Sequence, residues 1–175
     1  MLLTENYEEI IHKLFQRRPG KKPTDCSVME TILDCYDNPQ NAYPIIHVAG
    51  TNGKGQVAAK IAFALQNAGL KVGLFISPHL FDYRERITIN GQKISEEKIL
   101  KYHFDFEEKL SRLPVEPNFF ECTTTYAFRY FKEENIDVAI VEVGLGGKFD
   151  ATNIVHPILS IITSVSFDHI EYLGE

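Results

Sequence analysis

PIIHVAGTNGKG, residues 44–55, is the stretch that decides the fold of this chain. It opens with a continuous apolar run, Pro44 to Ala49, which predicts a strand buried on both faces. Glycines follow, and Val57 to Ala68 then carries Ala, Ile, Phe and Leu at helical spacing, with Gly69 as the expected C-terminal cap. Lys71 to Ile76 is a second apolar strand. Strand, glycine turn, helix and strand make a βαβ unit, which predicts a parallel sheet covered by helices.

The segments around this unit predict the rest of an α/β fold. Arg86 to Ile94 alternates around the tight-turn dipeptide Asn90-Gly91, and we interpret it as a hairpin that forms an excursion from the main sheet. The other expected elements are helices over Leu3 to Phe15, Val28 to Tyr36 and Thr123 to Phe131, a helix beginning at Ser95, and strands over Val138 to Val143 and Ile158 to Val165. The predicted fold is a three-layer α/β sandwich in which helices flank a mainly parallel sheet.

Composition and charge narrow the class of protein. The 175 residues are 44% hydrophobic and 24% charged, which is ordinary for one domain with a core of its own. The formal net charge of -6 disfavours nonspecific binding to nucleic acid. Cys26, Cys35 and Cys122 lack CxxC spacing, so neither a disulfide framework nor a zinc site is expected. The N-terminus is not of the signal type and no apolar run reaches spanning length, so we expect a cytoplasmic protein without a membrane partner.

The glycine turn is the strongest chemical signal in the chain. Gly50-Thr51-Asn52-Gly53-Lys54-Gly55, followed by Gln56, lies between a buried strand and a helix. Glycines let several backbone amides point inward, the helix N-terminus adds positive potential, and a lysine reaches the β- and γ-phosphates of a nucleotide. We therefore predict a fold of P-loop type in which residues 50–56 bind ATP and Lys54 balances phosphate charge. The strict pattern is not met, because Val48 and Gly55 stand where it has Gly and Ser or Thr. A plain glycine-rich turn with a solvated lysine remains the alternative.

Two polar residues follow predicted strands at the edge where open α/β sheets bind ligands. Glu142 interrupts the apolar run from Val138, and a buried carboxylate there needs either a cation such as Mg²⁺ or a neighbouring Lys or Arg. His169 follows Asp168 after the last predicted strand. By itself such a histidine is more often a hydrogen-bonded surface or core residue than a metal ligand.

Several motifs in fixed order resemble the folylpolyglutamate synthase and dihydrofolate synthase family of the Mur ligase superfamily. They are HVAGTNGKG, SPHL, RERI, VEVGLGG, DATN and FDH, and the similarity runs from Thr24 to Gly174. The resemblance implies an ATP-dependent ligase that adds L-glutamate to folate, with dihydropteroate as a further candidate substrate. Members are longer, so residues 1–175 correspond to an incomplete N-terminal ATP-binding domain without the C-terminal domain. We expect this part alone to be inactive and to self-associate, and the full-length protein to be a monomer.

The resemblance also assigns roles to individual residues. It implies Mg²⁺ ligands at Ser77, Glu142 and His169, with Lys54, Glu142 and His169 in catalysis. It implies substrate contacts at Arg84, Arg86, Lys148 and Asp150. From the residues alone, Arg84 and Arg86 are equally consistent with a solvated charge group around Glu85.

Two departures from the family pattern stand out, and two other functions stay open. Gln56 replaces a serine, and Lys148 replaces an arginine whose bidentate fork a lysine cannot form. A Mur-type peptide ligase is one alternative, although such ligases have Thr where this chain has Gly55. A noncatalytic nucleotide-binding module is the other, motivated by Gln56 and the short chain.

Overall fold

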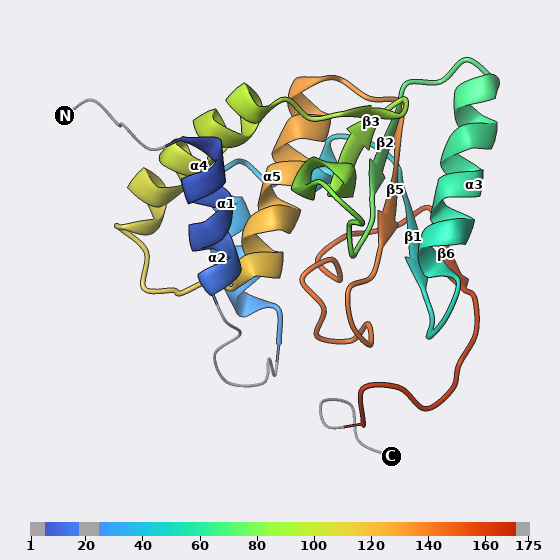
Figure 1. Cartoon of the computed structure of the whole chain (residues 1–175). Helices are drawn as coiled ribbons and strands as arrows, with labels where there is room; N and C mark the ends of the chain where they lie inside the picture. Colours follow the sequence, from blue (N-terminus) through green and yellow to red (C-terminus); the bar gives the residue numbers. More distant parts are fainter. Residues whose placement is uncertain (1–5, 18–24, 171–175) are drawn as a thin grey trace.

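The computed structural model describes residues 6–17 and 25–170, and a mixed sheet forms their middle layer (Figure 1). Its strands are β1 Ile45–Ala49, β2 Val72–Phe75, β3 Ile87–Ile89, β4 Gln92–Lys93, β5 Val138–Glu142 and β6 Leu159–Ile162. The order across the described sheet is β4-β3-β2-β5-β1-β6. Strands β2, β5, β1 and β6 are parallel, whereas β3 and β4 are antiparallel. The prediction of a mainly parallel sheet is confirmed.

Helices cover both faces of the sheet. They are α1 Tyr7–Gln16, α2 Ser27–Asp34, α3 Lys54–Asn67, α4 Glu96–Leu110 and α5 Phe119–Glu133, with short 3₁₀ turns η1 Pro39–Asn41 and η2 Tyr83–Arg86. In Figure 1, α3 lies on one side of the sheet and α1, α2, α4 and α5 lie on the other. Two separate apolar clusters fill the two spaces between these layers. The predicted three-layer sandwich is confirmed.

The alternation of side chains along β5 shows how the sequence builds both cores. Val138 and Ile140 pack in the cluster under α3, while Ala139 and Val141 pack in the cluster under the other helices. Because successive side chains of a strand point to opposite faces, Glu142 continues the face that α3 covers. The strand thus delivers a carboxylate to the start of that helix.

The hairpin corrects one prediction, because it is part of the main sheet and not an excursion from it. β3 pairs with β2 from Ile87 opposite Phe75 to Ile89 opposite Gly73. The Asn90 side chain also accepts a hydrogen bond of 2.8 Å from the Val72 amide. The tight turn itself is confirmed, with positive φ at Asn90 and Gly91. Apolar Ile87 and Ile89 are buried, which explains why the hairpin adds to the sheet edge.

Several other boundaries differ from the sequence prediction; α5, for example, begins at Phe119 and not at the expected Thr123. The helix expected from Val57 begins at Lys54, because Gly53 in the left-handed region already serves as its N-cap. The strand expected to reach Val165 ends at Ile162, where the chain turns to contact the loop after β1. The predicted helix start at Leu3 lies outside the described residues.

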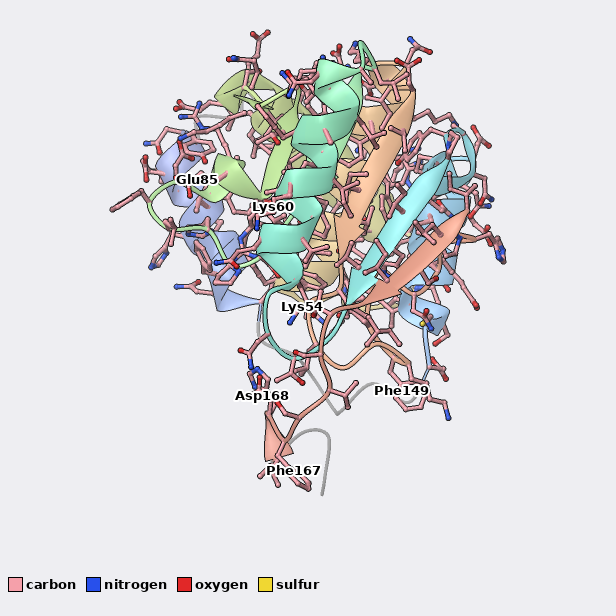
Figure 2. The ribbon with its side chains drawn as sticks, turned by 90° about the vertical axis from the view of Figure 1, so that its right-hand side faces the viewer. Lys54, Lys60, Glu85, Phe149, Phe167 and Asp168 are labelled. Carbon is pink, nitrogen blue, oxygen red and sulfur yellow. The ribbon has the colours of Figure 1, made fainter. Side chains whose placement is uncertain are left out.

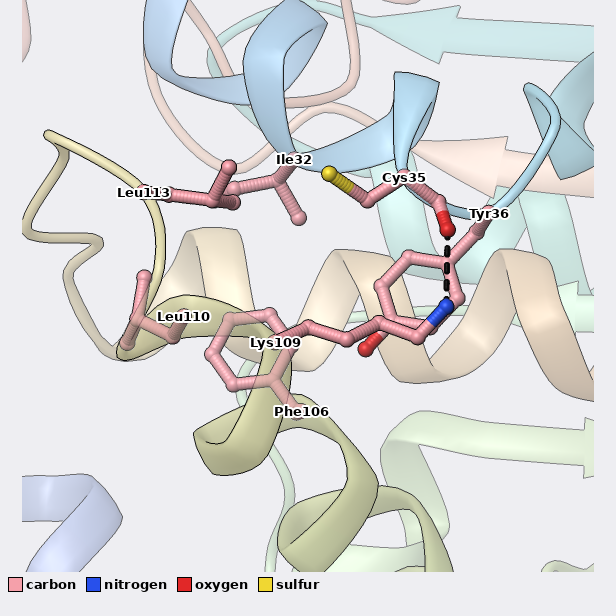
Figure 3. A pocket seen from close by; sticks show the side chains of 7 residues that line it. All are labelled: Ile32, Cys35, Tyr36, Phe106, Lys109, Leu110 and Leu113. Carbon is pink, nitrogen blue, oxygen red and sulfur yellow. Dashed lines mark hydrogen bonds between the residues drawn. The ribbon is translucent and has the colours of Figure 1, made fainter.

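On the face away from α3, helices α2 and α4 meet in a shallow groove that their own side chains fill (Figure 3). Lys109 donates a hydrogen bond of 2.8 Å to the Cys35 carbonyl at the end of α2. The same ammonium group lies 4.3 Å from the ring centroid of Tyr36, and the Arg129 guanidinium lies 4.1 Å from it. A cation at a helix C-terminus and over an aromatic ring stabilises the packing of the helices, so we assign this groove a structural role.

Candidate nucleotide and metal site

The carboxyl ends of the parallel strands meet at one edge of the sheet, and the predicted site residues gather there. Figure 2 shows Lys54 at the lower end of α3, with Phe149 and Asp168 at the same end of the molecule. The loop from β1 to α3, the loop after β2 and the loop after β5 all start from this edge. Ligands of open α/β sheets bind at such an edge.

The loop from β1 to α3 leaves the first turn of that helix without a side-chain cap. Gly50 and Gly53 have φ of 131° and 82°, a region that favours glycine. Gly53 is the N-cap and has no side chain to bond to the helix start, and the first turn holds no acidic residue. The first helical bond runs from the Val57 amide to the Gly53 carbonyl at 3.0 Å, so the amides of residues 54–56 precede it. Such a helix start is suited to an anion.

Lys54 is held within this loop. Its side chain is half-buried, and its ammonium group donates a hydrogen bond of 3.2 Å to the Thr51 carbonyl. The Lys54 side chain is therefore folded back onto the loop and does not extend into solvent.

Glu142 is a buried carboxylate that forms no ion pair with any of the residues that the structure describes. Its side chain is 3% exposed, and its Oε2 accepts a hydrogen bond of 2.8 Å from the Ser77 amide. Burial raises its pKa above the usual value, an effect that the Ser77 amide, Lys54, the Gly55 amide and Arg86 oppose. Within the described residues neither Lys54 nor Arg86 forms a direct ion pair with it. A buried carboxylate without a cationic partner is a suitable ligand for a divalent cation. Glu142 therefore fits the predicted Mg²⁺ site.

Gly55 makes room for Glu142. A Cβ placed on Gly55 would lie 3.4 Å from Glu142 Oε2 and 3.5 Å from Oε1, and therefore in ordinary van der Waals contact with the carboxylate. The helix backbone thus comes close to the carboxylate. A residue with a longer side chain at position 55 would fill the space beside it.

The three predicted metal ligands are only partly brought together. Ser77 and Glu142 are joined through the Ser77 amide. His169 is exposed, its amide donates to Asp168 Oδ1 at 2.8 Å, and its Nε2 lies 3.8 Å from Asp168 Oδ2. Among residues 6–17 and 25–170, no group of three His, Cys, Asp or Glu side chains is arranged to hold a metal. The metal roles of Ser77, Glu142 and His169 therefore stay predictions.

The two predicted substrate arginines have different surroundings. Arg84 forms ion pairs with Asp82 at 2.8 Å and Glu96 at 3.3 Å. Arg86 is 7% exposed, donates from Nε to His79 Nδ1 at 2.8 Å, and lies over the Phe119 ring at 5.1 Å. Burial lowers the pKa of Arg86. Of the two, only Arg86 lacks a carboxylate partner within the described residues, so it is the better placed to bind an anion.

Comparison with known proteins agrees with the sequence motifs. No family model matches the chain. The folylpolyglutamate synthase of Arabidopsis thaliana is 43% identical over 148 residues, which cover 82% of this chain and 24% of the relative. The dihydrofolate synthase/folylpolyglutamate synthase of Bacillus subtilis is 41% identical over 151 residues, covering 83% and 35% respectively. A solved complex of folylpolyglutamate synthase with AMPPCP and folate superposes with a TM-score of 0.93 at 36% identity, covering 98% of this chain and 43% of that one.

The chain belongs to the folylpolyglutamate synthase and dihydrofolate synthase family. It spans about a quarter to two fifths of the length of these relatives. The family was predicted from ordered motifs, and the identities over nearly the whole chain confirm that prediction.

The loop after β5, where this family member has Lys148, is held by Asp150. Asp150 Oδ2 accepts from the Leu145 amide at 2.8 Å, and Oδ1 accepts from the Thr152 amide at 3.0 Å and its hydroxyl at 2.5 Å. Asp150 is buried, whereas Lys148 is exposed with its ammonium 5.1 Å from the Phe149 ring centroid. Asp150 thus shapes the loop, and the predicted substrate contacts of both residues stay untested.

Sequence reasoning missed the residues that support the site of this family member. His79 holds Arg86, and Glu85 accepts hydrogen bonds from the amides of Leu80, Phe81 and Asp82 at 2.8 to 3.4 Å. Thr163 and Ser164 bond to the loop at Asn52. The spacing of Asp82 and Glu85 is that of a capping box and could have indicated the bond from the Asp82 amide to Glu85, whereas no local pattern indicates that His79 accepts from Arg86.

Proposed function

We propose that this chain is the nucleotide-binding part of an ATP-dependent ligase that joins L-glutamate to folate or to dihydropteroate. The observation that carries the proposal is the convergence of an uncapped helix start, Lys54 and the ion-pair-free carboxylate of Glu142 at one sheet edge. Anionic phosphates complement the first two, and a phosphate-bound cation complements the third. The complex of a relative with AMPPCP, an analogue of ATP, and folate supports the same assignment.

In this proposal the amides of residues 53–56 and the Lys54 ammonium bind the phosphates. A Mg²⁺ ion, when bound by Glu142 and Ser77 with His169 as the third proposed ligand, supplies positive charge that offsets the phosphate oxygens. Arg86 would bind an anionic group of the substrate beside this site, with His79 fixing its guanidinium. We keep Arg84, Lys148 and Asp150 as proposed substrate residues of lower rank, because Arg84 and Asp150 already have partners.

The proposed reaction has two steps. The substrate carboxylate attacks the γ-phosphorus of ATP, ADP leaves, and an acyl phosphate forms. The amine of glutamate then attacks the acyl carbon, loses a proton and displaces inorganic phosphate. Orientation and electrostatic stabilisation dominate such chemistry, and the chain supplies both at the sheet edge.

We further propose that residues 1–175 form part of the N-terminal ATP-binding domain of the ligase, and that the full-length protein is monomeric and cytoplasmic. Among the described residues, no helix is long and apolar enough to cross a membrane.

Mass analysis of the product tests the proposal. The full-length protein that carries this chain is incubated with ATP, Mg²⁺, glutamate and either dihydropteroate or tetrahydrofolate. We expect a product heavier by one glutamyl unit and release of ADP and phosphate in equal amounts. ATP binding without any glutamyl product would favour the noncatalytic module, and transfer to a peptidoglycan precursor would favour the Mur-type ligase.

A further inference from the structure

A segment that follows β6 is attached along the phosphate loop, although more than a hundred residues separate them in sequence. The Thr163 amide donates to the Ala49 carbonyl at 3.0 Å, and the Thr51 amide donates to the Ser164 carbonyl at 2.8 Å. These backbone bonds extend the pairing of β1 with β6 into the loop itself. We call residues 163–166 the staple segment.

Side chains of the staple segment bind both backbone polar groups of one loop residue, Asn52. The Thr163 hydroxyl donates to the Asn52 carbonyl at 2.7 Å, a shorter contact than its 3.3 Å approach to the Ala49 carbonyl. The Ser164 hydroxyl accepts from the Asn52 amide at 3.1 Å. A single hydroxyl proton serves one acceptor well, so the shorter contact is the principal bond of Thr163. Asn52 itself is exposed, and these bonds restrict a residue that solvent alone would leave free.

The contact is close enough to require glycine. A Cβ on Gly50 would lie 2.2 Å from Thr163 Oγ1 and 2.9 Å from the Ser164 carbonyl oxygen. The loop and the staple segment therefore pack backbone against backbone. Any change in the loop path must be accompanied by a change in the staple segment.

The staple segment also leads to the proposed metal ligand. The Thr51 hydroxyl donates to the Ser166 carbonyl at 3.1 Å and accepts from the Ser166 amide at 3.0 Å. Asp168 and His169 follow within three residues. The phosphate loop and His169 thus belong to segments joined by hydrogen bonds at Thr51 and Asn52.

We infer that Thr163 and Ser164 are positioning residues of the nucleotide site, which hold the backbone of Asn52 and couple the phosphate loop to the Asp168-His169 segment. The inference rests on the proposed nucleotide function. Because the amides of Thr51 and Asn52 are bonded to Ser164, phosphate binding falls to the amides from Gly53 onward. Nucleotide binding would then reduce the motion of the staple segment as well as that of the loop.

The matched pair Thr163→Val and Thr163→Ser tests the hydroxyl. Valine keeps the shape of the side chain and removes the donor, whereas serine keeps the donor. We expect valine to weaken MgATP binding about fivefold, as the loss of one hydrogen bond predicts, and serine to change it less than about twofold. Titration calorimetry on the full-length protein measures affinity, and thermal melting without nucleotide measures stability.

Hydrogen exchange tests the coupling. In the unaltered protein, MgATP should slow amide exchange in a peptide covering residues 163–170. In Ser164→Ala, which changes an exposed side chain, and in Thr163→Val, this protection should be lost or reduced at saturating MgATP. Unchanged affinity and unchanged protection in both variants would overturn the inference while leaving nucleotide binding intact. Failure of the unaltered protein to bind MgATP would overturn the proposed function, and this inference with it.

Discussion

The start of α3 and the start of α5 solve the same problem of helix geometry in opposite ways. At α5, the Asn118 side chain accepts from the amides of Phe120 and Glu121 at 2.8 and 3.0 Å, and Glu121 Oε2 accepts from the Asn118 amide at 2.7 Å. At α3, the N-cap is Gly53, which has no side chain to offer, and no acidic residue follows in the first turn. The first amides of a helix lack partners inside it, so each start must be satisfied from elsewhere.

The difference between these two starts shows which of the two is available to a ligand. α5 satisfies its own amides with a reciprocal capping box, and α4 does so with Ser95 bonded to the Lys98 amide. The amides of α3 and the charge of Lys54 instead face the proposed phosphate site. A glycine N-cap gives the start of α3 less stability than a side-chain cap would, because Gly53 offers no acceptor to the first amides of the helix.

The largest expected effect comes from removing the charge at the uncapped start. In the full-length protein, Lys54→Ala should lower turnover at least ~100-fold, as the loss of a charged transition-state donor does elsewhere. Melting should be nearly unchanged, because Lys54 makes one hydrogen bond and is half-buried. Lys60→Ala, on an exposed part of the same helix (Figure 2), is the matched control. Near-normal turnover in Lys54→Ala would refute the phosphate-loop assignment.

Alanine substitutions at Gly50 and Gly53 should lower the free energy of unfolding by different amounts. Gly53→Ala should lower the free energy of unfolding by about 1 kcal/mol, because the φ of Gly53 is positive but no atom lies within 4 Å of the added Cβ. Gly50→Ala should lower the free energy of unfolding by about 3 kcal/mol, because the backbone strain of a positive φ and the clash with Thr163 add to each other. Urea unfolding without nucleotide measures both. Equal losses would mean that the staple segment does not pack against Gly50 in solution.

Removing the cap of α5 should affect stability alone. We expect Asn118→Ala to lower the free energy of unfolding by about 1 kcal/mol, and Asn118→Asp, which keeps the acceptor, to lose less. Nucleotide affinity should be unchanged in both. An Asn118 variant with normal stability but weaker ATP binding would contradict the assignment of a purely structural role to the start of α5.

The stability contributed by Asp82, the N-cap of η2, should depend on pH. Asp82 accepts from the Arg84 amide at 2.9 Å and forms an ion pair with the Arg84 guanidinium, and these contacts hold its pKa below the ordinary value of 3.8. A lowered folded-state pKa contributes stability above pH 3.8 that is lost as the pH falls further. Asp82→Asn should therefore be less stable at pH 7, and the difference should shrink below pH 3.8. Urea midpoints across this range measure it, and a constant difference would argue against an ionic cause.

The smallest effect is expected at Gln56, an exposed residue in the first turn of α3. Gln56→Ser should hold or slightly increase ATP affinity, within about threefold, because a short hydroxyl fits close to phosphate oxygens. Calorimetry of the two proteins decides this. A clear loss of affinity would show that the Gln56 amide contributes a contact of its own.

Local pattern was sufficient for the elements and the loop. Burial periodicity and glycine placement are properties of neighbouring residues, so the strand from Pro44, the following helix and the second strand could be predicted without knowing the rest of the fold. The same holds for the tight turn at Asn90-Gly91 and the N-cap at Ser95. For the site, strand position predicted that Glu142 and Lys54 lie at one edge.

Only the tertiary structure decided which partner each polar side chain has. The bond between Ser77 and Glu142 joins residues 65 apart, and that between Asn52 and Ser164 joins residues 112 apart. Arg84 and Arg86 are two residues apart in sequence, yet one binds two carboxylates and the other is buried beside His79. The hairpin was placed wrongly for the same reason. A strand or a charged side chain is stabilised by whatever the fold brings next to it, and that neighbour lies far away in the sequence.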